Sequence, residues 1–191
     1  MSAELHRQIL DALWRPGLAA RTGVFAILDG ARDERIFGAV DATYQPKECL
    51  YSGDLPWQMQ MTAPYLVELA RDDRFTTLLL EKGWGNSWGT FLRSEIGLKE
   101  LRRHLRQFLR VRTEDGKRLI FRYYDPRVLR VYLPTCRPAE LETFFGPVDA
   151  FLIEGEDAGE MVEFRREGNL LVQSSVVKEG KLWAASASGS G

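Results

Sequence analysis

Residues 98–124, LKELRRHLRQFLRVRTEDGKRLIFRYY, decide the class of fold, because the hydrophobic period changes along this stretch. The first part repeats its apolar residues at i, i+3, i+7, i+10 and i+11, which predicts an amphipathic helix over 98–111. Gly116 then follows two acidic residues in a hairpin-turn signal, and the residues of 119–124 alternate as in a strand. The stretch therefore indicates a protein that mixes helices and strands.

The remaining elements continue this mixture. Residues 3–13 have helical spacing, and the apolar run Val24–Leu28 predicts a buried strand that ends in a turn at Asp29-Gly30. Short helices are expected just after Pro126 and over 139–145, and further strands over 151–153, 161–165 and 170–173. The sequence thus predicts an α/β (α+β mixed) fold, a single compact domain with a mixed sheet flanked by helices and a small C-terminal β-rich extension.

The expected organisation of the chain has three parts. Residues 1–147 form the core domain, and residues 148–183 form the β-rich C-terminal extension of the same domain. Residues 184–191 contain only Ala, Ser and Gly, a composition typical of a flexible tail or a linker.

Composition favours a soluble folded protein. Hydrophobic residues make up 45% and charged residues 28% of the 191 residues, an ordinary balance for a globular chain. Residues 1–14 lack the apolar core of a signal peptide, and no stretch has the 18 or so uncharged apolar residues of a membrane span. Cys49 and Cys136 stand alone without metal-ligand spacing. We expect a cytoplasmic protein without disulfide, metal or cofactor.

The charge distribution singles out one helix face. The net charge is −1, but residues 93–132 hold 12 Lys or Arg against 5 Asp or Glu. Within the predicted helix the cations fall in an arc of about 100°. We predict partner binding by Arg102, Arg103, Arg106 and Arg110. These charges can pair either with an acidic partner protein or with the chain's own acidic C-terminal third, where the candidate residues are Glu154, Glu156, Asp157 and Glu160.

Catalytic motifs are not evident in the sequence. His6 and His104, the only histidines, have no partner in a metalloprotease or serine-hydrolase pattern, and no glycine-rich nucleotide motif occurs. Asp29, Asp125 and Arg122 can be assembled into an acid/base set, which leaves a hydrolase as an alternative. We favour structural roles for these three residues, because Asp29 begins a turn, Asp125 stands at a helix start, and Arg122 could pair with either aspartate.

Two structural hypotheses follow from local sequence. Arg122 and Asp125 are expected to tie a strand, a turn and a helix together, with Pro126 at the first helical position. Trp84 and Trp88, four residues apart in a glycine-rich stretch, are expected to lie in the core.

Several peptides, taken in order, resemble one family. They are LDGA at 28–31, APYLV at 63–67 with Pro64, Trp84-Gly85 followed by Gly89 and FL at 91–92, LRRHLR at 101–106, and FRYYDPRVL at 121–129. Together they resemble the adaptors, or effector chaperones, of bacterial type VI secretion (Tap/TEC proteins) over roughly residues 23–150.

The resemblance implies a non-catalytic protein. Such adaptors bind a toxic effector and promote its loading onto the VgrG spike protein, so the implied partners are a cognate effector and VgrG, with no nucleic acid. The alternatives are a nucleic-acid-associated protein that uses the basic helix 98–111 and, with less support, a hydrolase that uses Asp29 and Asp125.

Overall fold

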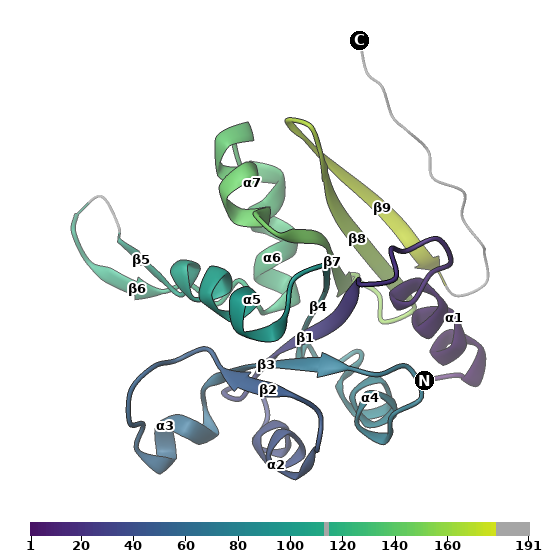
Figure 1. The fold of residues 1–191 in the computed structure, drawn as a ribbon, viewed down its shortest axis with the longest axis horizontal. Coiled ribbons are helices and arrows are strands. Elements are labelled where there is room, and N and C mark those ends of the chain that lie inside the picture. The colour runs from purple at the N-terminus through teal and green to yellow at the C-terminus, as the bar shows by residue number, and fades with distance from the viewer. Residues whose placement is uncertain (113–114, 179–191) are drawn as a thin grey trace.

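A seven-stranded sheet forms the centre of the computed structural model, which describes residues 1–112 and 115–178 (Figure 1). The strands lie in the order β2-β3-β1-β4-β7-β8-β9. Their bounds are β1 Gly23–Asp29, β2 Lys47–Cys49, β3 Pro64–Leu69, β4 Gly89–Ser94, β7 Val148–Glu154, β8 Glu160–Glu167 and β9 Leu170–Lys178. A separate two-stranded sheet consists of β5, Arg110–Arg112, and β6, Arg118–Ile120, and forms an arm that projects from the molecule.

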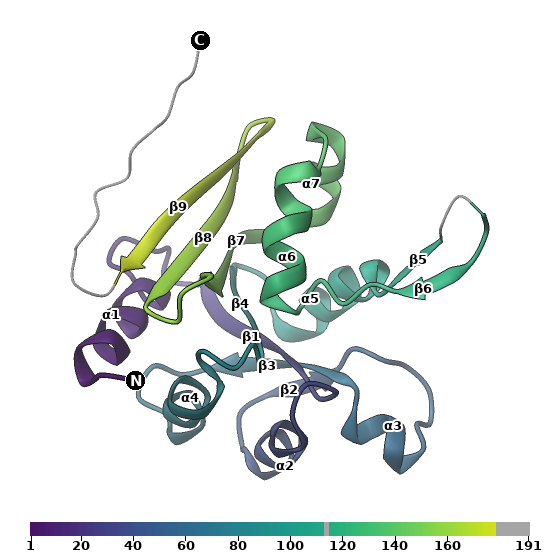
Figure 2. The same cartoon turned by 180° about the vertical axis from the view of Figure 1, so that it is seen from behind.

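Helices cover both faces of the central sheet (Figure 2). The α-helices of the described residues are α1 Ala3–Leu13, α2 Glu34–Ala42, α3 Trp57–Met61, α4 Arg74–Leu78, α5 Leu98–Leu105, α6 Pro126–Tyr132 and α7 Pro138–Phe145. Helices α1, α2 and α4 contribute to one hydrophobic cluster, and α5, α6 and α7 contribute to a second cluster on the other face. The predicted combination of helices and strands in a single compact domain is therefore confirmed.

Strand β1 shows why its sequence is apolar without interruption. Val24, Ala26 and Leu28 belong to one cluster, whereas Phe25 and Ile27 belong to the other. Successive side chains of a strand point to opposite faces, so a strand covered on both faces needs apolar residues at every position. The buried strand predicted from this run is confirmed.

The prediction of a mixed sheet is wrong, because every strand pair of the described residues is antiparallel. Strands β7, β8 and β9 are consecutive in the chain and adjacent in the sheet, with only residues 155–159 and 168–169 between them. Connections this short join antiparallel neighbours, since a parallel pair needs a crossover of a dozen or more residues.

The stretch 98–124 departs from its predicted bounds in two places. Helix α5 ends at Leu105 and continues as a 3₁₀ turn over Arg106–Phe108, after which Arg110–Arg112 forms β5. Strand β6 ends at Ile120, residues 121–122 have no regular secondary structure, and residues 123–124 lie in a turn. Pairing between β5 and β6 explains the first change, because it draws residues 110–112 out of the helix. Of the predicted hairpin turn, Glu114 lies outside the described residues.

The C-terminal strands belong to the main sheet. Strand β7 pairs with β4, so residues 148–178 extend the sheet from its middle to one edge. The end of the predicted extension, 179–183, and the predicted tail, 184–191, lie outside the described residues. Within residues 1–112 and 115–178, no helix is long and apolar enough to cross a membrane.

Candidate partner-binding surface

The predicted arginine face begins on α5, a helix whose N-cap residue makes no side-chain hydrogen bond to the first turn. Gly97 occupies the N-cap position and offers no side chain to the first helical N–H groups. Leu101 and Leu105 are fully buried and hold the helix against the sheet. Because one face of α5 packs in this way, its cations lie on the remaining sides of the helix.

Arg102 differs from the other arginines, because it holds the fold together. Its Nε donates to the carbonyl of Cys49 at 2.6 Å, and a terminal nitrogen donates to the carbonyl of Tyr51 at 3.1 Å. The Nε also lies 3.5 Å from a carboxylate oxygen of Glu48. Arg102 therefore links α5 to β2, and its partners are found there.

The other three arginines have no ion-pair partner among residues 1–112 and 115–178. Arg103 and Arg110 are exposed, and Arg106 is half-buried. Arg103 lies on α5, Arg106 in the 3₁₀ turn and Arg110 on β5, so the predicted ridge is a patch formed by three consecutive elements. We call Arg103, Arg106 and Arg110 the arginine patch.

An internal partner in the C-terminal third was one of the two expected uses of these arginines, and the structure contradicts it. Glu154 is buried and accepts a hydrogen bond from the amide of Gly85. Glu156 lies 3.9 Å from Arg130, which belongs to α6. The one ion pair that the predicted ridge makes within the described residues is that of Arg102 with Glu48.

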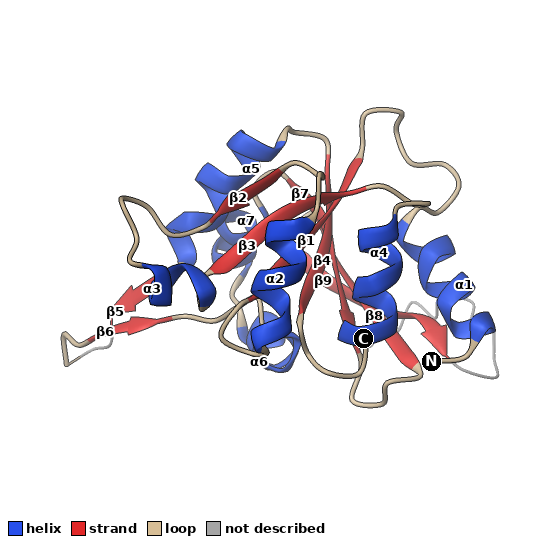
Figure 3. Ribbon diagram, turned by 90° about the horizontal axis from the view of Figure 1, so that it is seen from below, coloured by secondary structure: helices blue, strands red, loops and turns tan. Residues whose placement is uncertain are grey.

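A cleft of about 520 Å³ lies beside the arginine patch. Arg106 and Arg110 contribute to its lining together with Leu50, Leu55, Met59 and Ile120. The residues around it come from α3 and the segments flanking it, from the 3₁₀ turn after α5, and from the β5–β6 arm. Helix α3 and the arm lie at the same end of the molecule (Figure 3). The volume falls within the range of clefts that take a small ligand or a short peptide segment.

Asp29 and Arg122 form a structural ion pair. The Asp29 carboxylate is only 1% exposed at the end of β1, and Nε of Arg122 donates to it at 3.0 Å. Burial raises the pKa of Asp29, and the hydrogen bond from Arg122 opposes that rise. The next residue, Gly30, lies so close to the backbone of Met61 and Ala63 that an added Cβ would stand 2.6 Å from a carbonyl oxygen of each. The pair thus stabilises a turn with no room for a side chain at position 30.

Asp125 caps helix α6, as its position before Pro126 predicts. Its carboxylate accepts from the amide of Arg127 at 3.0 Å and from the Arg127 guanidinium at 2.6 and 2.9 Å. Burial acts to raise the pKa of Asp125, but the hydrogen bonds from Arg127 outweigh it and leave this pKa below its usual value. Arg122 and Asp125 were expected to act together, but each has a different ion-pair partner, Asp29 for Arg122 and Arg127 for Asp125.

These contacts give the hydrolase alternative no support. Asp29 and Asp125 are both engaged by arginines and backbone amides. The cavity lined by Leu28, next to Asp29 in the chain, measures about 10 Å³, which is room for one water. His104 contacts the carbonyl of Phe144 at 2.9 Å, a packing contact between α5 and α7. The described residues contain no cluster of three metal-ligating side chains.

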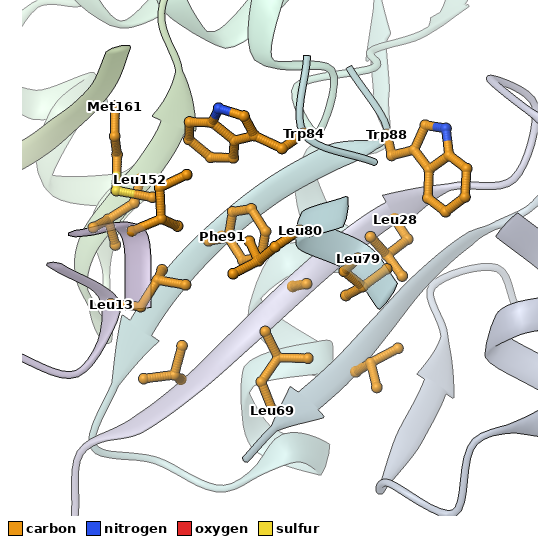
Figure 4. Close-up of a cluster of buried hydrophobic side chains, with 14 of the residues drawn as sticks. Leu13, Leu28, Leu69, Leu79, Leu80, Trp84, Trp88, Phe91, Leu152 and Met161 are labelled. Carbon is orange, nitrogen blue, oxygen red and sulfur yellow. The ribbon is translucent and has the colours of Figure 1, made fainter. Parts of the chain in front are cut away.

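Trp84 and Trp88 are buried, so their predicted place in the core is confirmed. Figure 4 shows both indoles along one side of a hydrophobic cluster that includes Leu28 and Phe91. Each indole N–H is satisfied, that of Trp84 by the carbonyl of Ala158 at 2.5 Å and that of Trp88 by Asp33 at 3.2 Å. A buried indole needs such a partner, which explains why both rings are tolerated in the interior.

Comparison with known proteins identifies the family. A family model described as Domain of unknown function (DUF4123) matches residues 24–143, well over half of the chain. The chain therefore belongs to this family. Its members are the type VI secretion adaptors that load effectors, so the resemblance inferred from peptides 28–31 to 121–129 is confirmed. No curated protein and no solved structure gives a match.

Proposed function

We propose that this protein is a non-catalytic cytoplasmic adaptor that binds a cognate toxic effector and promotes its loading onto the VgrG spike protein. Family membership supports a chaperone role in type VI secretion. The observation that carries the partner-binding part is the arginine patch, because Arg103, Arg106 and Arg110 have no internal carboxylate among the described residues. An acidic surface of another protein supplies the missing charge.

A delivery protein benefits from this kind of surface. Charges at the edge of an interface speed association and are screened by salt, so a complex formed through them assembles quickly and remains releasable. Arginine suits the role, since its planar group forms paired hydrogen bonds with carboxylates and loses little freedom per bond.

Nucleic-acid binding is the second candidate, because the same exposed arginines would attract phosphates. The cleft beside them favours a protein partner, since Leu50, Leu55, Met59 and Ile120 contribute an apolar surface rather than a row of stacking aromatics. The sequence pI of about 6.2 also lacks the strongly basic character typical of nucleic-acid-binding domains.

Affinity purification from the native host tests the proposal. When the wild-type protein is purified with low-salt washes, we expect mass spectrometry to find an effector and the VgrG spike among the co-eluting proteins. The double variant Arg103→Glu/Arg106→Glu should associate with the purified effector about tenfold more slowly at low salt, with the difference shrinking at high salt. Retention of nucleic acid without effector or spike would contradict the adaptor function and favour the second candidate.

A further inference from the structure

The cleft beside the arginine patch has exposed apolar walls. Met59 of α3 is 47% exposed, and Ile120 of β6 is 60% exposed. Trp57 and Met61 of α3 and Val111 and Leu119 of the arm are also exposed, but they lie outside the lining of the cleft. A group of exposed apolar side chains around a hollow marks a binding site more often than chance, since isolated ones are the rule on protein surfaces.

The inner part of the cleft is preformed. Leu50 is fully buried and Leu109 nearly so, and both contribute to the lining. Arg102 holds the carbonyls on either side of Leu50, those of Cys49 and Tyr51, which fixes this segment against α5. A ligand therefore meets an apolar base whose position is already set, and it does not have to order that base on binding.

The wall formed by α3 is adaptable. This helix has five residues and none of them is buried, so the exposed side chain of Met59 has room to adjust to a ligand. Met59 is unbranched and polarisable, properties that let methionine fit partners of different shape. The cleft thus joins a rigid base to a deformable wall.

Charge selects the ligand. Arg106 and Arg110 contribute cations to the lining, and none of the lining residues is acidic. A purely apolar segment would leave these guanidinium groups without a partner, whereas carboxylates next to the apolar side chains would pair with them. We infer that the cleft binds a short segment of the effector in which apolar side chains are flanked by Asp or Glu. The inference rests on the proposed adaptor function.

Site-specific photo-crosslinking tests the location. A photoreactive amino acid is placed at Met59 or at Ile120 of the full chain, and at Leu170 as a control, because Leu170 is 71% exposed on β9 and outside the cleft. The probe is the effector that co-elutes from the native host. Both cleft positions should crosslink to one segment of the effector, and mass spectrometry should find apolar residues with Asp or Glu within about four positions. Crosslinks to a basic segment, or from position 170 alone, would overturn the inference.

Binding measurements on matched variants test how much the cleft contributes to the affinity for the effector. Met59→Asp and Ile120→Asp should each lower the affinity for the effector by at least about tenfold, because each adds a carboxylate where the ligand presents its own. Val131→Asp is the control, since Val131 is 69% exposed on α6. A synthetic peptide of the crosslinked segment should bind the wild type, and its Asp→Asn and Glu→Gln form should bind at least tenfold more weakly.

The outcomes separate the two proposals. If the wild-type protein retains effector and spike but Met59→Asp and Ile120→Asp bind like Val131→Asp, the assignment of the cleft is wrong and the adaptor function stands. If the wild type retains neither effector nor spike, the adaptor function fails, and the assignment of the cleft fails with it.

Discussion

At the scale of residues, Asp29 and Asp125 each pair with an arginine, but the two pairs have different structural roles. Asp29 is buried and depends on Arg122, a residue 93 positions later in the chain, to neutralise its charge. Asp125 caps a helix and is paired with Arg127, two positions away. The first contact links distant segments, whereas the second is local, and their removal should differ accordingly.

Arg122→Ala should lower the free energy of unfolding by about 2–3 kcal/mol, because it leaves the carboxylate of Asp29 buried without its cation. The loss is smaller than for a fully buried pair, since the Arg122 side chain is 41% exposed. Urea denaturation measures it. Arg7→Ala, which breaks the exposed pair with Glu4, should leave the denaturation midpoint close to that of the wild type. Equal midpoints for the two variants would contradict the role of Arg122.

Asp125→Ala should cost about 1–2 kcal/mol at pH 7, because α6 loses its N-cap. The Asp125 pKa in the folded protein lies below its usual 3.8, so its ionised form stabilises the fold at neutral pH. That contribution is present above about pH 4 and is lost as the pH falls through the folded pKa. The difference in melting temperature between variant and wild type should therefore shrink from pH 7 to pH 3. A constant difference would show that the carboxylate charge has no part in it.

At the scale of elements, the arginines of α5 and of the segment that leads into the β5–β6 arm have two different roles. Arg102 binds the carbonyls of Cys49 and Tyr51, while the arginine patch has no internal partner among the described residues. Arg102 therefore stabilises the fold, whereas the arginine patch, by our proposal, binds a partner protein.

Arg102→Ala should destabilise the isolated protein by about 1–3 kcal/mol, because the carbonyls of Cys49 and Tyr51 lose a charged hydrogen-bond donor. Arg103→Glu should leave the melting temperature within about 1 °C of the wild type, since surface substitutions away from such contacts are nearly neutral. Calorimetry of both variants without any partner measures the contrast. Similar melting temperatures would mean that Arg102 belongs with the arginine patch.

Prediction from sequence succeeded where the signal was local. The unbroken run Val24–Leu28 indicates a strand covered on both faces, and Asp125 before Pro126 indicates a capped helix start. The end of α5 was missed because Leu109 continues the helical period, while the pairing of β5 with β6 that ends the helix is a tertiary effect.

The cleft could not be predicted for a similar reason. Met59 lies in the weakly periodic region 31–60, and nothing in the sequence shows that it faces Ile120 across about 60 residues of chain. The carbonyl partners of Arg102, on Cys49 and Tyr51, are likewise distant in the chain, so the sequence offers no reason to separate Arg102 from the neighbouring arginines. One signal was available and unused: Arg93 interrupts an apolar strand, and an arginine in such a place needs a buried partner.

At the scale of the whole molecule, Arg93 and its partner Glu163 connect elements that are far apart in the chain. Arg93 on β4 donates to Glu163 on β8 at 2.5 Å and to the carbonyl of Ala12 on α1 at 3.1 Å, and both charged side chains are almost completely buried. Burial lowers the pKa of Arg93, and Glu163 opposes that shift. Arg93 and Glu163 therefore connect the N-terminal helix, the middle of the sheet and a C-terminal strand, and Arg15 and Arg165 pair with the same carboxylate.

Glu163→Ala should lower the free energy of unfolding by about 3–5 kcal/mol, because Arg93 would remain buried without a counter-charge. Glu167→Ala is the matched control, since Glu167 also lies on β8 and pairs with Arg165 but is exposed, and its loss should cost less than about 1 kcal/mol. Thermal denaturation of both variants measures the difference. Equal stability would show that the pair of Arg93 and Glu163 contributes little to the fold.

The place of β7 beside β4 has a practical consequence for anyone who trims this chain. The family match ends at residue 143, yet β4 has its next neighbour in the sheet only from Val148 onward. A fragment cut at the family boundary would leave the amide and carbonyl groups of β4 open to the strands of other molecules, a situation that promotes self-association. Fragments prepared for crystallisation or for binding assays should therefore run through Lys178, so that the edge of the sheet is the natural edge formed by β9.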